Sequence, residues 1–106
     1  MTYADVFVAL ADPTRRHIFE SLRSQPKTVG EIAAEQPVSR PAVSQHLKVL
    51  ESAGLVSVQP QGNRRFYSLE REGLTDLRRY LDDFWTDALG AYGAEIDRLN
   101  EQDGEG

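Results

Sequence analysis

Apolar residues recur at helical spacing in the first part of the chain, and turn-forming residues divide them into short segments. The first set stops at Asp12-Pro13, where an aspartate can cap a new helix and a proline fits its first turn. The second set ends at Gln25-Pro26, because the residue before a proline is pushed out of the helical region. The pattern predicts a helix over about residues 3–11 and a second helix from Pro13. The apolar positions are Val6, Phe7 and Leu10, followed by Ile18, Phe19 and Leu22.

Two further helix starts carry capping signals. Thr28 and Glu31 have the spacing of a capping box, in which hydroxyl and carboxylate satisfy exposed backbone N–H groups. Ser39 can cap the next helix, and Gly54 can close it in a left-handed conformation. The pattern therefore predicts two short helices that meet across residues 36–38. The later helix buries Val43, Leu47 and Leu50 on one face, which leaves Arg40, Pro41, Ser44, Gln45 and Lys48 on the other.

The second half of the chain predicts a hairpin and a long helix. β-Branched and aromatic residues dominate 55–58 and 65–69, and we expect residues 59–63 to form the turn between them. Apolar residues then recur at helical spacing over 74–99, which corresponds to about 39 Å of helix if it is unbroken. Gly90 and Gly93 count against its continuity. Residues 100–106 are polar, and we expect a disordered acidic tail behind a single domain of residues 1–99.

Composition narrows the class of protein. With 106 residues, 40% hydrophobic and 27% charged, the chain has the balance of one globular domain. The absence of Cys excludes disulfides, thiolate metal sites and Cys nucleophiles. The N-terminal residues lack a basic region followed by an apolar run, so we expect no secretory signal, no membrane partner and a cytoplasmic location.

The net charge of −5 hides a segregation along the chain. Residues 1–73 carry nine basic and eight acidic side chains, whereas residues 74–106 carry three basic and nine acidic ones. Within residues 39–65, four basic side chains stand against one acid, Glu51, which gives a local charge of +3. The acidity therefore belongs to the C-terminal segment, and the middle of the chain can face phosphate.

The order of the predicted elements is that of a winged helix-turn-helix, a mainly α fold with a small β-hairpin. A recognition helix needs short hydrogen-bonding side chains and an Arg at its N-terminal end, because that end reaches the base edges. Arg40, Ser44 and Gln45 meet this demand, while Lys48, Arg64 and Arg65 suit phosphates. We predict DNA binding by Thr28, Ser39, Arg40, Pro41, Ala42, Ser44, Gln45, His46, Lys48, Gly62, Asn63, Arg64, Arg65 and Tyr67.

Several motifs resemble the ArsR/SmtB family of bacterial winged helix-turn-helix repressors, over Tyr3 to about Leu99. This resemblance implies a homodimer that binds an operator and represses transcription, often of its own gene, with dimer contacts from the first and last helices. The motifs are DPTRR at 12–16, SRPAVSQHLKVL at 39–50, AGLV at 53–56, Gly62, and RFY at 65–67.

The chain departs from the metal-sensing members of that family. Thr28-Val29-Gly30 stands where the thiolate sensors have Cys-Val-Cys, and the last helix lacks the His ligands of other members. The two histidines, His17 and His46, fall in different predicted helices, and carboxylates alone do not make a usual transition-metal site. We therefore expect no metal and no cofactor. The sequence does not identify a small-molecule effector.

The long last helix outreaches a compact domain of this length, which favours a second copy as partner. A two-fold dimer would place two recognition helices about 34 Å apart, in successive major grooves of a palindromic DNA site. We predict a dimer interface of Val6, Phe7, Leu10, Leu77, Leu81, Phe84, Trp85, Ala88, Leu89, Tyr92 and Ile96.

Other interpretations remain open on the sequence alone. A winged-helix module can bind protein or RNA, and a dimer seam around Trp85 can hold a small ligand. Arg15 and Arg16 suit either an ion pair at a helix start or a DNA backbone contact. His46 suits packing or a phosphate contact. Asp82, Asp83 and Asp87 are typical of a solvated helix face, because no nucleophile or orienting base accompanies them, so we expect no enzyme.

Overall fold

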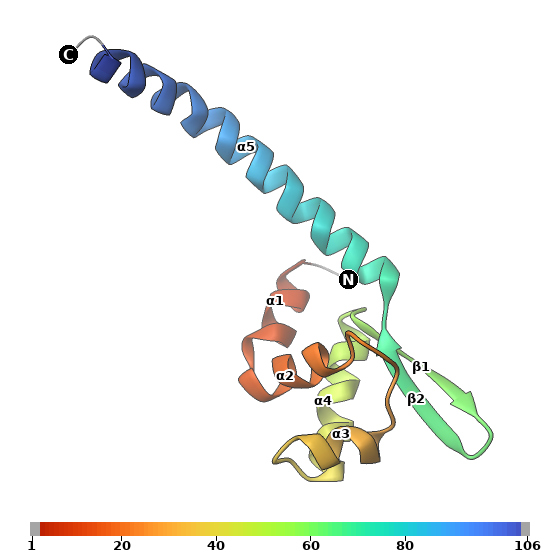
Figure 1. The fold of residues 1–106 in the computed structure, drawn as a ribbon. Coiled ribbons are helices and arrows are strands. Elements are labelled where there is room, and N and C mark those ends of the chain that lie inside the picture. Colours follow the sequence, from red (N-terminus) through yellow and green to blue (C-terminus); the bar gives the residue numbers. More distant parts are fainter. Residues whose placement is uncertain (1–2, 105–106) are drawn as a thin grey trace.

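The computed structural model describes residues 3–104, apart from the side chains of Tyr3, Ala94, Ile96, Asp97 and residues 101–104. In this part of the chain, helices surround a small core, a two-stranded antiparallel hairpin extends to one side, and a long helix projects away (Figure 1). The elements are α1 (Tyr3–Ala11), α2 (Pro13–Ser21), α3 (Val29–Glu35), α4 (Arg40–Ser52), β1 (Val56–Gln61), β2 (Arg64–Leu69) and α5 (Arg71–Gly104).

The capping signals in the sequence are confirmed. Asp12 is the N-cap of α2, and its Oδ2 accepts a hydrogen bond from the Arg15 backbone N–H at 2.8 Å. Thr28 and Glu31 form the complete capping box at the start of α3. Ser39 caps α4 by accepting from the Ala42 N–H at 3.3 Å. These local bonds satisfy backbone donors that the first turn of a helix leaves without partners.

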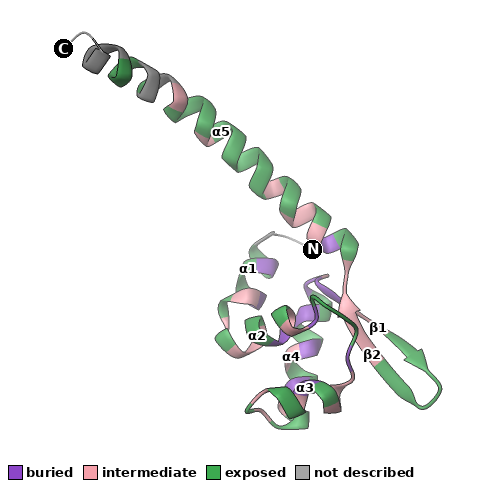
Figure 2. Ribbon diagram, viewed as in Figure 1, coloured by how far each residue is buried: buried purple, intermediate pink, exposed green. Residues whose placement is uncertain are grey.

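The core lies where α4 packs against α1, α2 and α3. The three fully buried side chains of α4, Val43, Leu47 and Leu50, are the ones that its apolar spacing predicts. Burial is concentrated in the four short helices and the start of the hairpin, whereas α5 is largely exposed beyond its first turns (Figure 2). The core is completed by Val6, Ala9, Ile18, Leu22, Ile32, Ala53, Leu55 and Val56.

The hairpin is longer and its turn tighter than the sequence predicts. β1 continues through Gln59 and Pro60 to Gln61, and β2 begins at Arg64, so the expected five-residue turn is wrong. Gly62 makes the short turn possible, because its φ of 62° lies in the left-handed region. Pro60 pairs with Arg65 in the antiparallel register, and its missing N–H is tolerated on the outer edge of a strand.

Helix α5 is also longer than its apolar pattern. It begins at Arg71 and its backbone stays helical to Gly104, five residues beyond the last apolar position, Leu99. Gly90 and Gly93 do not break it, and a Cβ atom on either glycine would meet no atom within 4 Å beyond the adjacent helix backbone. The backbone of residues 100–104 is thus helical where we expected a disordered tail. Residues 105–106 of that predicted tail lie outside the described part.

The projecting helix gives the molecule an elongated shape. Its principal extents are 70 × 26 × 22 Å and its radius of gyration is 19.7 Å. A compact chain of this length would have a radius of gyration of about 13 Å. Within residues 3–104, no helix combines the length and apolar character needed to cross a membrane. Beyond its first turns, α5 exposes both charged and large apolar side chains.

Two arginines at the start of α2 hold the end of α1. Arg15 donates from Nε to the Ala9 carbonyl at 2.5 Å and from Nη2 to the Val8 carbonyl at 3.2 Å. Arg16 donates from Nη1 to the Leu10 carbonyl at 3.0 Å. Cationic donors at a helix C-terminus satisfy its free carbonyls and oppose its dipole. These bonds give the two arginines a role as a cap for α1, which is neither the ion pair at a helix start nor the DNA backbone contact that the sequence suggests.

Candidate nucleic-acid interface

An open groove of about 680 Å³ lies between α3, the first turns of α4 and the hairpin. It brings together residues from three separate stretches of the chain, around positions 28–34, 40–44 and 64–67. Three of its side chains are arginines and one is a glutamate. Its lining residues are Thr28, Val29, Gly30, Glu31, Ala34, Arg40, Ser44, Arg64, Arg65 and Tyr67.

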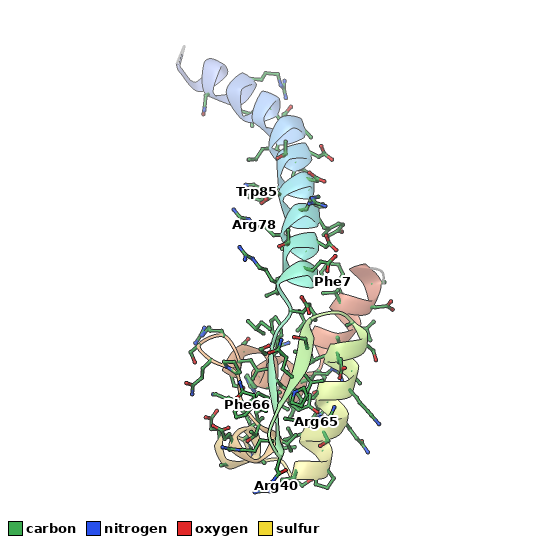
Figure 3. All side chains as sticks on the ribbon, turned by 90° about the vertical axis from the view of Figure 1, so that its right-hand side faces the viewer. Phe7, Arg40, Arg65, Phe66, Arg78 and Trp85 are labelled. Atoms are coloured by element: carbon green, nitrogen blue, oxygen red, sulfur yellow. The ribbon has the colours of Figure 1, made fainter. Side chains whose placement is uncertain are left out.

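Arg40 lies against the first turn of α3. A Cβ atom placed on Gly30 would come within 3.1 Å of Arg40 Nη2 and 3.3 Å of Arg40 Cζ. The glycine thus leaves room for the planar guanidinium to rest on the α3 backbone. Figure 3 shows Arg40 at the bottom of the molecule, far from Trp85 on the projecting α5. The candidate interface and the exposed helix are therefore well separated.

The hairpin is attached to the base of α3 by backbone pairing. Lys27 and Tyr67 exchange two hydrogen bonds, from Lys27 N to Tyr67 O at 2.9 Å and from Tyr67 N to Lys27 O at 2.8 Å. The Lys27 ammonium is buried and forms an ion pair with Glu35 at 2.8 Å. Tyr67 also packs against the hydrophobic core. This connection sets the position of β2 beside α3.

Arg64, the first residue of β2, contacts two other side chains. Its Cζ lies 5.3 Å from the centre of the Phe66 ring, within the range of a cation–π contact. Its Nη2 lies 3.6 Å from Oε1 of Glu31 on α3. Both carboxylate and guanidinium are substantially exposed, so water is able to reach the pair. Arg65 is exposed as well and lines the same groove.

The structure gathers six of the predicted DNA-binding residues in the groove and leaves the others around it. Gln45 and Lys48 are exposed on α4, as are Ser39 and Pro41 at its start. Ala42 and His46 are half-buried on the same helix. Gly62 and Asn63 form the tight turn of the hairpin. The six in the groove are Thr28, Arg40, Ser44, Arg64, Arg65 and Tyr67.

Four groove residues were not predicted, namely Val29, Gly30, Glu31 and Ala34 on α3. The capping box had placed Glu31 at a helix start, but it did not reveal which way that helix faces. Helical spacing from Thr28 offers the signal, because residues three and four apart share a face. Glu31 therefore belongs beside Thr28 on the groove side of α3.

Two capping carboxylates are held ionised by their local bonds. The pKa of Glu31 is lowered from its ordinary value, first by the Thr28 backbone N–H and then by the Thr28 hydroxyl, with a smaller effect of Arg64. The pKa of Asp12 is lowered chiefly by the Arg15 backbone N–H, and the charge of His46 contributes. His46 belongs to α4, which packs against α2.

These lowered pKa values predict acid sensitivity. A carboxyl group that ionises more readily in the folded state stabilises folding above its unfolded pKa, and this stabilisation is lost as the pH falls through the folded pKa. The variant Asp12→Asn/Glu31→Gln keeps capping side chains and lacks both titrating groups. Between about pH 5 and about pH 3 its melting temperature should fall less than that of the parent. If the melting temperatures of variant and parent fall by the same amount over this pH range, the acid sensitivity belongs to other groups.

The acidic residues of α5 lie on a solvated face. Asp82, Asp83 and Asp87 are all exposed. Asp82 lies 3.7 Å from Arg78 four residues earlier in the helix, a spacing typical of weak surface ion pairs. Among the described residues, no three His, Asp or Glu side chains gather closely enough to hold a metal ion. The three aspartates thus lie where a solvated helix face predicts them.

Comparison with known proteins identifies the fold and its function. Residues 12–58 match the model of the bacterial regulatory protein family arsR. The chain is 58% identical over 89 residues to the HTH-type transcriptional regulator Rv2034 of Mycobacterium tuberculosis, covering 84% of this chain and 83% of the relative. The chain belongs to the ArsR family. It is also 36% identical to the transcriptional repressor SdpR of Bacillus subtilis, over 76% of this chain and 89% of SdpR.

A solved structure supports the assignment of this ArsR-family chain. The homodimeric winged helix-turn-helix DNA-binding domain of Mb0332 from Mycobacterium bovis, a possible ArsR-family regulator, superposes with a TM-score of 0.66 and 28% identity. The match covers 82% of this chain and 81% of that domain. The ArsR-family chain is thus a winged helix-turn-helix transcriptional regulator and not an enzyme. Its hairpin β1–β2 is the wing.

Proposed function

We propose that this regulator is a homodimeric repressor that binds a palindromic operator and does not sense a metal. The groove between α3, α4 and the wing supports the DNA-binding part, because it brings Arg40 of the predicted recognition helix together with Arg64 and Arg65 of the wing. Residues 39–48 read base edges in the major groove, and the wing holds the phosphate backbone. The groove is the observation on which this assignment rests.

The exposed apolar face of α5 supports the dimer. Phe84, Trp85 and Tyr92 are 61, 62 and 68% exposed, which is unusual for large aromatic side chains in water. At 3.6 residues per turn, they share one side of the helix with Leu81, Ala88, Leu89 and Leu99. The homodimeric state of the Mb0332 domain points the same way. Pairing of two such faces would bury this apolar surface.

The remaining members of the predicted interface occupy different surroundings. Val6 is only 3% exposed and belongs to the chain's own core, so we leave it out of the proposed dimer surface. Leu10 and Leu77 are half-buried against that core. Phe7 is 46% exposed, and its ring meets Tyr80 of α5 edge to face with 5.8 Å between centres. The side chain of Ile96 lies outside the described residues.

The absence of metal sensing remains part of the proposal. It is supported by the chemistry of the residues at the place where the resemblance would put thiolate ligands. Thr28 and Gly30 carry no thiolate, and Thr28 already uses its hydroxyl in the capping box. Addition of Zn²⁺, Ni²⁺ or Cd²⁺ should therefore leave operator affinity unchanged, whereas release of DNA by one of these ions would contradict the proposal.

Binding to DNA can be tested without a known operator sequence. Selection from random duplex DNA should enrich a sequence with two-fold symmetry, which fluorescence anisotropy then compares with a scrambled duplex at two salt concentrations. We expect affinity for the enriched duplex to be at least about 10³-fold higher, with a steep salt dependence. Failure to enrich any duplex, or equal affinities, would favour an RNA or protein partner.

Two substitutions should separate base reading from backbone contact. Gln45→Ala should cost about 1–3 kcal/mol on the enriched duplex and relax the preference at one base position. Arg64→Ala should weaken binding to every duplex alike and reduce the slope of log affinity against log salt by about one. Anisotropy titrations on enriched and scrambled duplexes measure both effects. Equal losses from the two variants on all duplexes would refute this division of roles.

A further inference from the structure

The groove proposed to receive DNA contains an acidic side chain. Glu31 is the one carboxylate among its ten described lining residues, which also include three arginines. A negative charge in a groove that faces phosphates opposes binding unless a cation compensates it. The nearest such cation is Arg64, at 3.6 Å across the groove. This pairing connects α3 to the wing through side chains as well as through the backbone.

Glu31 is held firmly in this position. Its Oε1 accepts from the Thr28 backbone N–H at 3.1 Å and from the Thr28 hydroxyl at 3.0 Å. The same oxygen is the one nearest to Arg64. Because the capping box fixes the carboxylate and lowers its pKa, the negative charge is present and immobile at neutral pH.

Arg64, in contrast, is able to move. Its side chain is 62% exposed, and an ion pair between exposed groups contributes little net stability. Its second contact, the face of Phe66, comes from its own strand and does not fix it to α3. A guanidinium held this weakly can exchange one anionic partner for another at small cost. A DNA phosphate would be such a partner.

We propose that Glu31 is a positioning residue that competes with DNA phosphate for Arg64 and so restrains the affinity for the DNA backbone. In the free protein, Glu31 keeps Arg64 at the α3 side of the groove. On binding, Arg64 moves to a phosphate and leaves Glu31 without its cation. This inference rests on the proposed function, because it assumes that the groove receives duplex DNA.

Glu31→Gln is a clean test, because glutamine also completes a capping box while it carries no charge. With the competing carboxylate removed, affinity for a random duplex should rise about 5-fold, the factor expected for one unit charge at about 4 Å in water. The slope of log affinity against log salt should steepen by up to about one. Glu51→Gln, an equal charge change at an exposed position of α4 outside the groove, should leave both quantities unchanged.

A double-mutant cycle identifies the route of the effect. In the Arg64→Ala background, Glu31→Gln should change the affinity less than about 2-fold, since the residue for which it competes is gone. A 5-fold gain that persists without Arg64 would mean direct repulsion of phosphate and would overturn the proposal. So would an unchanged affinity in the single variant, or an equal gain from Glu51→Gln. If the parent protein itself binds no duplex, the proposed function fails, and this inference with it.

Discussion

The double variant Trp85→Ala/Leu89→Ala should convert the proposed dimer towards monomer. Both side chains lie on the exposed face of α5, at 62 and 52% exposure, and truncation removes most of the apolar area that they would bury against a second copy. Large aromatic anchors at interface centres commonly cost about 2 kcal/mol or more when truncated. We expect dimer dissociation to become easier by about 30-fold or more, as measured by sedimentation equilibrium.

Operator binding should weaken along with the dimer. A monomer would engage one half-site, so the loss should be larger on a symmetric enriched duplex than on a random one. The short helices should stay folded, because neither substituted side chain belongs to the core. Circular dichroism checks this point directly. Thr86→Ala, a truncation on the same exposed helix that leaves the charge unchanged, should leave the oligomeric state as it is.

If the Trp85→Ala/Leu89→Ala variant dissociates at the same concentration as the parent, the dimer interface does not lie on this face of α5. The alternative surface would then have to include α1, where Val8 is 65% exposed. Loss of dimer in the Thr86→Ala control would indicate that α5 tolerates no truncation, and the face-specific interpretation would fail. The two variants together therefore test which side of α5 meets the partner.

The short helices could be predicted from sequence because their limits are local. Asp12, Thr28 and Ser39 each satisfy backbone donors within three residues, and the adjoining prolines act on their immediate neighbours. The buried face of α4 followed from helical periodicity alone. Each of these features is set by residues close in sequence, wherever the rest of the chain lies.

The hairpin turn and the length of α5 were mispredicted for a common reason. Composition marked residues 59–63 as a loop, and Gly90 and Gly93 counted against the continuity of the last helix. Gln59, Pro60 and Gln61 nevertheless pair with the opposite strand, because that strand is held against Lys27 by backbone bonds far from the turn. Likewise, α5 tolerates Gly90 because a glycine weakens a helix without ending it. Strand pairing in the hairpin and the continuity of a long helix thus outweigh the weak local preferences of single residues.

Most of the candidate site was predictable by residue type, but its arrangement was not. Basic and hydrogen-bonding residues in a winged helix-turn-helix order pointed to Arg40, Ser44 and Arg64. The contact between Glu31 and Arg64 depends on the pairing that brings the wing beside α3, and no local pattern contains it. The roles of Arg15 and Arg16 were ambiguous for the same reason, since their acceptors are on the preceding helix.

Gly73 should be among the least replaceable residues of the chain. It is buried in the first turn of α5, where a Cβ atom would lie 1.9 Å from the carbonyl oxygen of Gly54 and 2.9 Å from its carbonyl carbon. Both neighbours are backbone atoms, so no side chain can rotate away. Gly54 itself has a φ of 76° and follows the end of α4. The start of α5 therefore lies directly on the segment that follows α4.

Gly73→Ala should lower the free energy of unfolding by about 1–3 kcal/mol, because the two backbones must separate to admit the methyl group. For a domain of this size, each kcal/mol lowers the melting temperature by about 4–8 °C. Gly90→Ala is the matched control: it makes the same change in the same helix, but its Cβ meets nothing within 4 Å, so it should cause no loss. Equal melting temperatures for the two variants would show that α5 can shift freely on α4. Unequal ones would indicate a fixed connection between α5 and the end of α4, so that in the proposed dimer a change in how two α5 helices pair would also move the two proposed recognition helices.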